Sequence, residues 1–550
     1  MGMKKRGDRL LWILGILGLI MYFVFSWQDL FAAQEWKMLS RDDVILKAQA
    51  TWKQENIDLS KYKVSAVMES AESMDGYLSK EDLHTAFEKQ APDNAPVTYW
   101  HVIFYNEQAQ RGTEAFTYET YHDLKSGKVL GYYRPALDTN TEITGKAGLQ
   151  KALQALRELG VDLSRLELLT TEEEMLDEAE VLESDEGYRS NSLSFSWQDT
   201  KYKVGESELY YDVYLNGAQV TEVTTAYYVP DAFTEWHDRQ TLYAALLTGV
   251  SLLGSFLLLV FAFVFLFLLQ QKRPYWSSLG LSLLVFVLYA VSNVNQWPLL
   301  RAQALDEGGM MSLLLTGALA IGLAVVTSVW IGASNYPLTM TGGMLVREVK
   351  PSLWLNRRDP EWSDRMRSAA KRGYALAFAW MGFQGLFYFI GENYFGVWYE
   401  NDLSMSPANM WVPALFPLLA WFAGISEEIT YRLFGVTFLK RYLKYSFVAA
   451  LLPAMVWALG HSLYPIYPIY TRFIELTIFG VIIGYCYLHY GLETVIFAHV
   501  TFDTVLMCIP LFLSGEAVQA VSATIFFVLP LVVGYGISLL KPRREQPDFA

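Results

Sequence analysis

Three short segments in the C-terminal half of the chain place ionisable side chains among strongly apolar neighbours. They are "AGISEEITYRLFG" at 423–435, "WALGHSLYP" at 457–465 and "AHVTFD" at 498–503. Ionisable residues are costly to bury in a membrane, so they usually face a cavity, pair with one another and mark a functional site. The residues in question are Glu427, Glu428, Arg432, His461, His499 and Asp503.

Helical spacing assigns different tasks to the two adjacent glutamates. Glu428 and Arg432 are four residues apart and can pair on one helix face, whereas Glu427 points about 100° away. We therefore interpret Glu428 and Arg432 as an orienting pair and Glu427 as the working carboxylate. His499 and Asp503 also lie one helical turn apart, as acid–base and metal-binding pairs on helices do. The alternative is an ion pair near a helix end, with Glu427 reaching water and His461 only bonding to a neighbouring helix.

Long apolar runs indicate that these segments lie in a membrane. The chain has 550 residues, of which 53% are hydrophobic and 15% aromatic. The first run, 10–27, follows four basic residues and predicts an uncleaved anchor rather than a signal peptide. With nine further runs of the length that a bilayer requires, we expect about ten transmembrane helices. The later runs are near 241–269, 276–295, 311–333, 374–396, 410–435, 446–464, 473–490, 492–513 and 518–540.

Basic residues recur in alternate loops, which predicts cytoplasmic N- and C-termini in a multi-pass protein of the cell (plasma) membrane. The pattern and the style of the domains are typical of bacteria. The expected organisation is a cytoplasmic N-terminus (1–9), the anchor (10–27), an extracytoplasmic domain (28–240), transmembrane helices 2–4 (241–345), a basic cytoplasmic loop (346–372), a helical core (373–540) and a cytoplasmic tail (541–550).

The external segment has the mixed periodicity of an α+β domain, with strand-like runs such as "TYWHVIFY". "AQATWKQENIDLSKYKV" at 48–64 aligns with "ALQALRELGVDLSRLEL" at 152–168, which predicts two repeats, about 40–135 and 145–232. Turns at Ser126-Gly127 and Asn216-Gly217 would close hairpins. The repeats are loosely similar to PepSY-type domains. The predicted fold class is a polytopic all-α membrane bundle with an extracytoplasmic α+β domain of two PepSY-like repeats between helices 1 and 2.

Composition excludes several other kinds of site. The net charge of −14 argues against nucleic-acid binding, and the acidic stretch at 171–187 is most simply solvated. Both cysteines, Cys486 and Cys508, fall in predicted spans, so the external segment cannot use disulfides. Its histidines are scattered and predict surface or core positions rather than ligands; they are His84, His101, His122 and His237.

Taken in order, the three segments read Glu-Glu-x-x-x-Arg, aromatic-x-x-x-His and His-x-x-x-Asn/Asp on successive membrane helices. This pattern resembles the CPBP family, also called Abi or CAAX protease and bacteriocin-processing proteins, over about residues 370–540. Trp457 stands where Phe is commoner, and Asp503 stands where Asn is often found. The resemblance implies an intramembrane endopeptidase whose catalytic residues are Glu427, Glu428, Arg432, His461, His499 and Asp503.

Two mechanisms are open for such a site. In the first, Glu427 activates a water that His461 helps to hold, and His499 with Asp503 faces the oxyanion. An ionised Asp503 would repel that oxyanion, so it is either protonated or orients His499. In the second, Zn²⁺ binds to Glu427, His461, His499 and Asp503. We expect the cavity to open towards the cytoplasm or the inner leaflet, away from residues 28–240.

The expected partners are membrane lipid and a peptide or membrane-protein substrate, with no nucleic acid. The family label does not name the substrate, because prenylated CAAX proteins are not expected in a bacterium. Two other functions stay open. One is a non-catalytic immunity or sensor protein whose external domain binds a ligand. The other is a proton-coupled transporter, because buried Glu, His and Asp also serve as proton relays.

Overall fold

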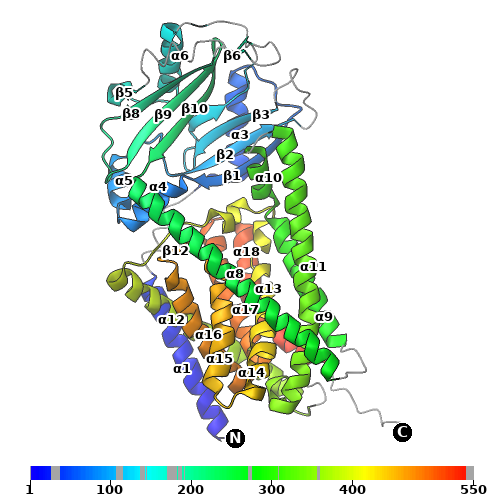
Figure 1. Ribbon diagram of the computed structural model, residues 1–550. Helices are drawn as coiled ribbons and strands as arrows, with labels where there is room; N and C mark the ends of the chain where they lie inside the picture. Colours follow the sequence, from blue (N-terminus) through cyan, green and yellow to red (C-terminus); the bar gives the residue numbers. More distant parts are fainter. Residues whose placement is uncertain are drawn as a thin grey trace.

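The computed structural model describes residues 2–26, 38–106, 116–136, 143, 145–169, 182–183, 189–190, 192–269, 276–306, 309–355 and 359–540. In this part of the chain, an α+β domain stands on one end of a bundle of long helices (Figure 1). We call that end of the bundle the domain-facing end and the opposite one the far end. Most of the acidic stretch 171–187, the basic pair Lys272-Arg273 and the tail 541–550 lie outside the described residues.

Eight helices of the described chain are long and apolar enough to cross a membrane, and the protein is a multi-pass membrane protein. Their apolar side chains are largely exposed on the outside of the bundle, as contact with lipid requires. These helices are α1 (Gly2–Phe25), α8 (Asp231–Leu268), α9 (Trp276–Asn295), α11 (Gly309–Val349), α12 (Trp362–Phe395), α16 (Tyr470–Tyr490), α17 (Leu492–Leu513) and α18 (Ala517–Ser538).

The other two predicted spans differ from the sequence pattern. The run 410–435 follows a short 3-10 turn at Pro407–Asn409, contains another at Pro413–Leu415 and becomes α-helical only at α13 (Leu418–Glu427). It continues as the π-helical segment η7 (Glu428–Val436) and as α14 (Thr437–Tyr442). The run 446–464 gives only the 14-residue α15 (Ser446–Leu459). Proline lacks an N–H group and fixes its own φ, which explains the delayed start of α13.

The region 346–372, predicted as a loop, is also mostly helical. Helix α11 extends to Val349 and α12 already begins at Trp362. The Arg372 guanidinium pairs with the Asp8 carboxylate at 2.8 Å, and the Ser363 hydroxyl donates to the Ser538 carbonyl at 2.7 Å. The starts of α1 and α12 therefore lie beside the end of α18 at the far end of the bundle. That both termini are cytoplasmic stays a prediction.

The α+β character of the external domain is confirmed. The chain runs twice through a helix followed by strands of one sheet, in the order β1-β2-β3-β4-β10-β9-β8-β5. The two halves meet edge to edge where β4 pairs with β10 (Figure 1). The first half contains α3 (Arg41–Gln54), β1 (Lys63–Ser70), α4 (Glu72–Lys80), α5 (His84–Gln90), β2 (Thr98–Tyr105), β3 (Thr117–Asp123) and β4 (Val129–Tyr133), and the second contains α6 (Gly145–Glu158), β5 (Leu166–Leu168), β8 (Ser192–Asp199), β9 (Glu208–Asn216) and β10 (Gln219–Tyr228). The likeness to PepSY-type repeats stays a prediction.

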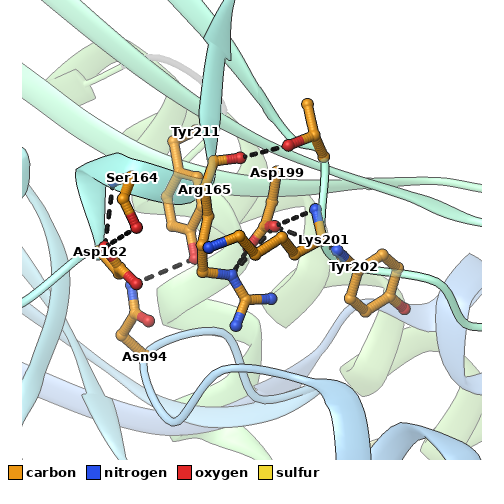
Figure 2. Close-up of polar contacts among 9 residues, drawn as sticks. Asn94, Asp162, Ser164, Arg165, Asp199, Lys201, Tyr202 and Tyr211 are labelled. Carbon is orange, nitrogen blue, oxygen red and sulfur yellow. Dashed lines mark hydrogen bonds and ion pairs between the residues drawn. The ribbon is translucent and has the colours of Figure 1, made fainter.

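Both predicted hairpins are present. Gly127 between β3 and β4 has φ +65°, and Gly217 between β9 and β10 has φ +57°. Such positive φ values suit glycine because it has no Cβ. The second half of the sheet is also tied to its own loops and to the first half (Figure 2). Arg165 pairs with Asp199 at 2.7 Å, and the Asn94 amide donates to the Tyr211 hydroxyl at 3.3 Å.

Polar and apolar contacts fix the domain on the bundle. The Asn409 side chain accepts a hydrogen bond from the Met68 N–H (2.7 Å) and donates one to the Met68 carbonyl (2.9 Å). It thereby pairs with edge strand β1 as a neighbouring strand would. Helix α10 (Trp297–Asp306) also packs Ala302 and Leu305 against the sheet.

The histidines of the domain occupy surface and core positions, as predicted. His84 is exposed, and His122 is buried beside the Gly127 carbonyl. His101 is buried between two carboxylates, with Nδ1 3.0 Å from Glu69 and Nε2 3.0 Å from Glu119. Burial alone would lower the pKa of His101, but the two carboxylates outweigh it and raise the pKa to about 10.

This histidine predicts how the stability of the external domain depends on pH. Its pKa is about 10 in the folded protein and about 6.5 in an unfolded chain. A raised pKa stabilises the folded state fully below the unfolded value, and this contribution is lost as the pH rises through the folded value. We therefore expect the free energy of unfolding to fall between about pH 6.5 and pH 10. Replacing His101 with Gln should flatten the decline, measured by denaturant unfolding at several pH values. An equally steep decline in that variant would contradict the assignment.

Candidate active site

The close approach of α13 and α17 brings the first and third sequence segments together. At Gly424, a Cβ atom would lie 2.7 Å from the Val500 side chain and 2.8 Å from its backbone nitrogen. Only glycine fits this contact. The next turn of the chain carries the two glutamates, so they face α17 at the level of His499. The chain changes from α- to π-helical hydrogen bonding between Glu427 and Glu428, a feature frequent at functional sites.

The predicted pairing of Glu428 with Arg432 is confirmed. Arg432 Nη1 donates to Glu428 Oε1 at 2.9 Å, and both side chains are almost wholly buried. The same carboxylate oxygen lies 2.8 Å from His499 Nδ1. The Arg432 guanidinium stacks 4.5 Å from the centre of the Trp457 ring. The Glu428 carboxylate therefore orients both the Arg432 guanidinium and the His499 ring.

Glu427 points away from this pair, but it has a partner of its own. The Trp457 indole Nε1–H donates to Glu427 Oε2. The Glu427 side chain is 22% exposed, whereas that of Glu428 is 0% exposed. One carboxylate oxygen of Glu427 is thus held in place, while the group as a whole remains accessible to a water molecule.

His499 connects all three carboxylates. Because its Nδ1 faces Glu428, its Nε2 faces Asp503 at 3.4 Å and Glu427 at 3.9 Å. The Asp503 side chain is 19% exposed. Glu427 and Asp503 are therefore both partly exposed, and both lie within 4 Å of the His499 Nε2 atom.

His461 lies beside this group, at the end of α15. Its Nδ1 is 2.9 Å from the Trp457 carbonyl, and its ring is 5.2 Å from that of Trp457. On its other side, the Tyr464 ring stacks at 5.6 Å. His461 thus reaches Glu427 through Trp457 rather than by a direct bond.

A cavity lies close to His461, on the side of the α+β domain. Residues 462–465 directly after His461 line this cavity together with Glu72 and Asp75 of the α+β domain. Helix α15 ends at Leu459, so its loop at the domain-facing end begins several residues earlier than the apolar run 446–464 indicates. His461 itself does not line that cavity, and the expectation that the site opens away from residues 28–240 stays a prediction.

Metal binding by the predicted ligands stays a prediction. Among the described residues, no group of three or more His, Cys, Asp or Glu side chains is arranged to hold a metal ion. His499 Nδ1 is engaged by Glu428 and His461 Nδ1 by a backbone carbonyl, so Nε2 of each histidine is the nitrogen that a metal would use. The four predicted ligands Glu427, His461, His499 and Asp503 are brought into one region, but not into a common coordination sphere.

Sequence reasoning missed two features of the site. One is the Trp457 indole, which bonds Glu427 and stacks on Arg432 and was read only as a variant of a phenylalanine position. The other is Arg472, which pairs with Glu475 at 2.5 Å and stacks 5.1 Å from the Tyr464 ring. The Arg-x-x-Glu spacing within an apolar run was a signal for this second pair.

The comparison with protein families agrees with this geometry. Residues 409–505 match the family model described as Type II CAAX prenyl endopeptidase Rce1-like. The chain carries a domain of the CPBP family. The match contains every predicted site residue and no part of the α+β domain. No curated protein and no solved structure matches the chain.

This CPBP domain supports a peptidase, and an intramembrane endopeptidase in general. The apolar helices around it agree with that class of protein. The cysteines take no part: Cys486 and Cys508 are free and lie within α16 and α17, as predicted.

Proposed function

We propose that the protein hydrolyses a peptide bond of a membrane-bound peptide or membrane protein, with Glu427 as the general base. The observation that carries this proposal is the Glu427 carboxylate. It is held by the Trp457 indole, partly accessible, and next to His499 and to a fully buried ion pair. A carboxylate in such a place can take a proton from a water that is held against it.

The surrounding residues supply orientation and charge. Glu428 and Arg432 fix the Nδ1 side of His499, so that Nε2 faces the accessible space. A doubly protonated His499 would donate its Nδ1–H to Glu428 and its Nε2–H to the oxyanion that forms when water attacks the carbonyl carbon. Glu427 would then return its proton to the leaving amine.

Asp503 departs from the asparagine that is often found at its position in this family. Its carboxylate lies 3.4 Å from His499 Nε2, a distance that suits charge attraction better than a short hydrogen bond. We assign Asp503 the task of stabilising the protonated His499 rather than binding the oxyanion itself. His461 and Trp457 would confine the water on the other side of Glu427.

A metal-free mechanism predicts that chelation has little effect. Peptides released from membranes with and without the protein would first identify a substrate. The purified protein, treated with a strong chelator and freed of metal, should then release the same peptides at an unchanged rate. Metal content of the sample, measured by elemental analysis, is the control. Activity that disappears on chelation and returns with Zn²⁺ would instead support the metal-dependent mechanism.

A further inference from the structure

A cavity of about 380 Å³ lies between the α+β domain and the domain-facing end of the bundle. Its walls come from four parts of the chain: the start of α4, the first turns of α8, residues 400–404 and residues 462–469. The volume is within the range of about 300 to 1,000 Å³ that ligand pockets occupy. The cavity therefore has room for a side chain and its neighbouring backbone.

The cavity wall is strongly acidic. Among the described residues that line it, Glu72, Asp75, Glu400 and Asp402 carry carboxylates and none is Lys or Arg. His237 is the only basic residue there, and it pairs with Glu400 at 3.0 Å. Glu72 and Asp402 are exposed. The wall thus keeps an excess of negative charge.

A second observation points to a polar ligand. The Ser462 hydroxyl belongs to a side chain that is 1% exposed, and it has no hydrogen-bond partner among the described residues. Ser462 lines the same cavity. Leaving a buried hydroxyl without a partner costs about 1–3 kcal/mol, so a bound group that bonds to it would gain affinity.

The cavity is also next to the site. Tyr464 lines it and stacks on His461 at 5.6 Å, while His461 contacts Trp457, which donates to Glu427. A group bound in the cavity beside Tyr464 would therefore be two ring contacts away from Trp457, the indole that donates to the Glu427 carboxylate.

We propose that this cavity binds a cationic group of the substrate, a Lys or Arg side chain or a free amino terminus, on the side of the membrane that carries the α+β domain. This inference rests on the proposed hydrolysis for the statement that the bound peptide is a substrate. The proposed binding of a cation rests only on the carboxylates and the Ser462 hydroxyl that line the cavity.

The test measures binding in a protein that should not cleave. The full chain with Glu427→Gln is placed in zwitterionic nanodiscs, and binding of dye-labelled acetyl-pentalysine amide is measured by fluorescence anisotropy. The neutral probe is the corresponding pentaglutamine peptide. We expect the lysine peptide to bind more tightly, and the double substitution Glu72→Gln with Asp402→Asn to weaken it by about tenfold.

The matched control is Glu88→Gln with Glu167→Gln, which removes the same charge from exposed sites of the α+β domain that do not line the cavity. It should leave the affinity nearly unchanged. Equal affinities for the two peptides, or equal losses in the two double variants, would overturn the proposal. If the Glu427→Gln protein still releases peptides from membranes, the proposed catalysis fails while a positive binding result stands.

Discussion

Replacing Glu427 with glutamine should lower the rate of peptide release by a factor on the order of 10² to 10⁴, the usual contribution of a general base. Glutamine has nearly the same shape and can still accept the Trp457 hydrogen bond through its carbonyl oxygen. It cannot take a proton from water. Peptide release from proteoliposomes, measured by mass spectrometry, would give the rate.

The control for this substitution is Glu348→Gln on α11. Glu348 is an exposed carboxylate that pairs with Arg441 at 2.8 Å, and a surface pair contributes little to stability. This variant should keep full activity, and both variants should unfold at nearly the wild-type temperature. A Glu427→Gln protein that remains within a few-fold of wild-type activity would rule out Glu427 as the base.

Replacing Arg432 with methionine should destabilise the bundle by about 3–5 kcal/mol, because it leaves a buried carboxylate without its main partner. Glu428 is 0% exposed and keeps only the contact with His499. The loss would appear in the free energy of unfolding in mixed detergent and SDS micelles. Activity should also fall, since the Glu428 carboxylate that orients His499 loses the guanidinium that holds it in place.

A double variant separates stability from catalysis. Glu428→Gln combined with Arg432→Met removes both buried charges and should recover much of the lost stability, as replacement of a whole buried ion pair often does. It should not recover activity, because His499 Nδ1 no longer faces a carboxylate. If the double variant is no more stable than Arg432→Met alone, the two charges are not coupled in the way that their 2.9 Å contact indicates.

Much of this arrangement could be predicted from sequence, because helical spacing is a local property. Residues i and i+4 share a helix face whatever the rest of the protein does, which explains why the Glu428–Arg432 pair was found. The strands of the external domain followed likewise from alternating residues and turn glycines. These signals depend only on neighbouring residues.

The features that the sequence did not predict depend on contacts between segments that are far apart in the chain. No local pattern says that the Trp457 indole reaches Glu427 from another helix. Apolar length also overestimates a span when the chain leaves its helix early, as it does after Leu459. The predicted end of this span was therefore wrong by several residues.

Asn409 links the sheet of the external domain to the segment that leads into α13. Its side chain is bonded to both backbone groups of Met68 on β1, and only eight residues lie between it and Leu418, where α13 begins. If β1 moved away from the bundle, the hydrogen bonds between Asn409 and Met68 would break, or the segment from Asn409 to α13 would have to move with the strand. Cutting away the external domain would, in turn, leave the buried Asn409 side chain with only the Leu403 carbonyl as a partner, and would uncover the apolar face of α10. The helical half of the chain is thus not expected to be stable as a separate module.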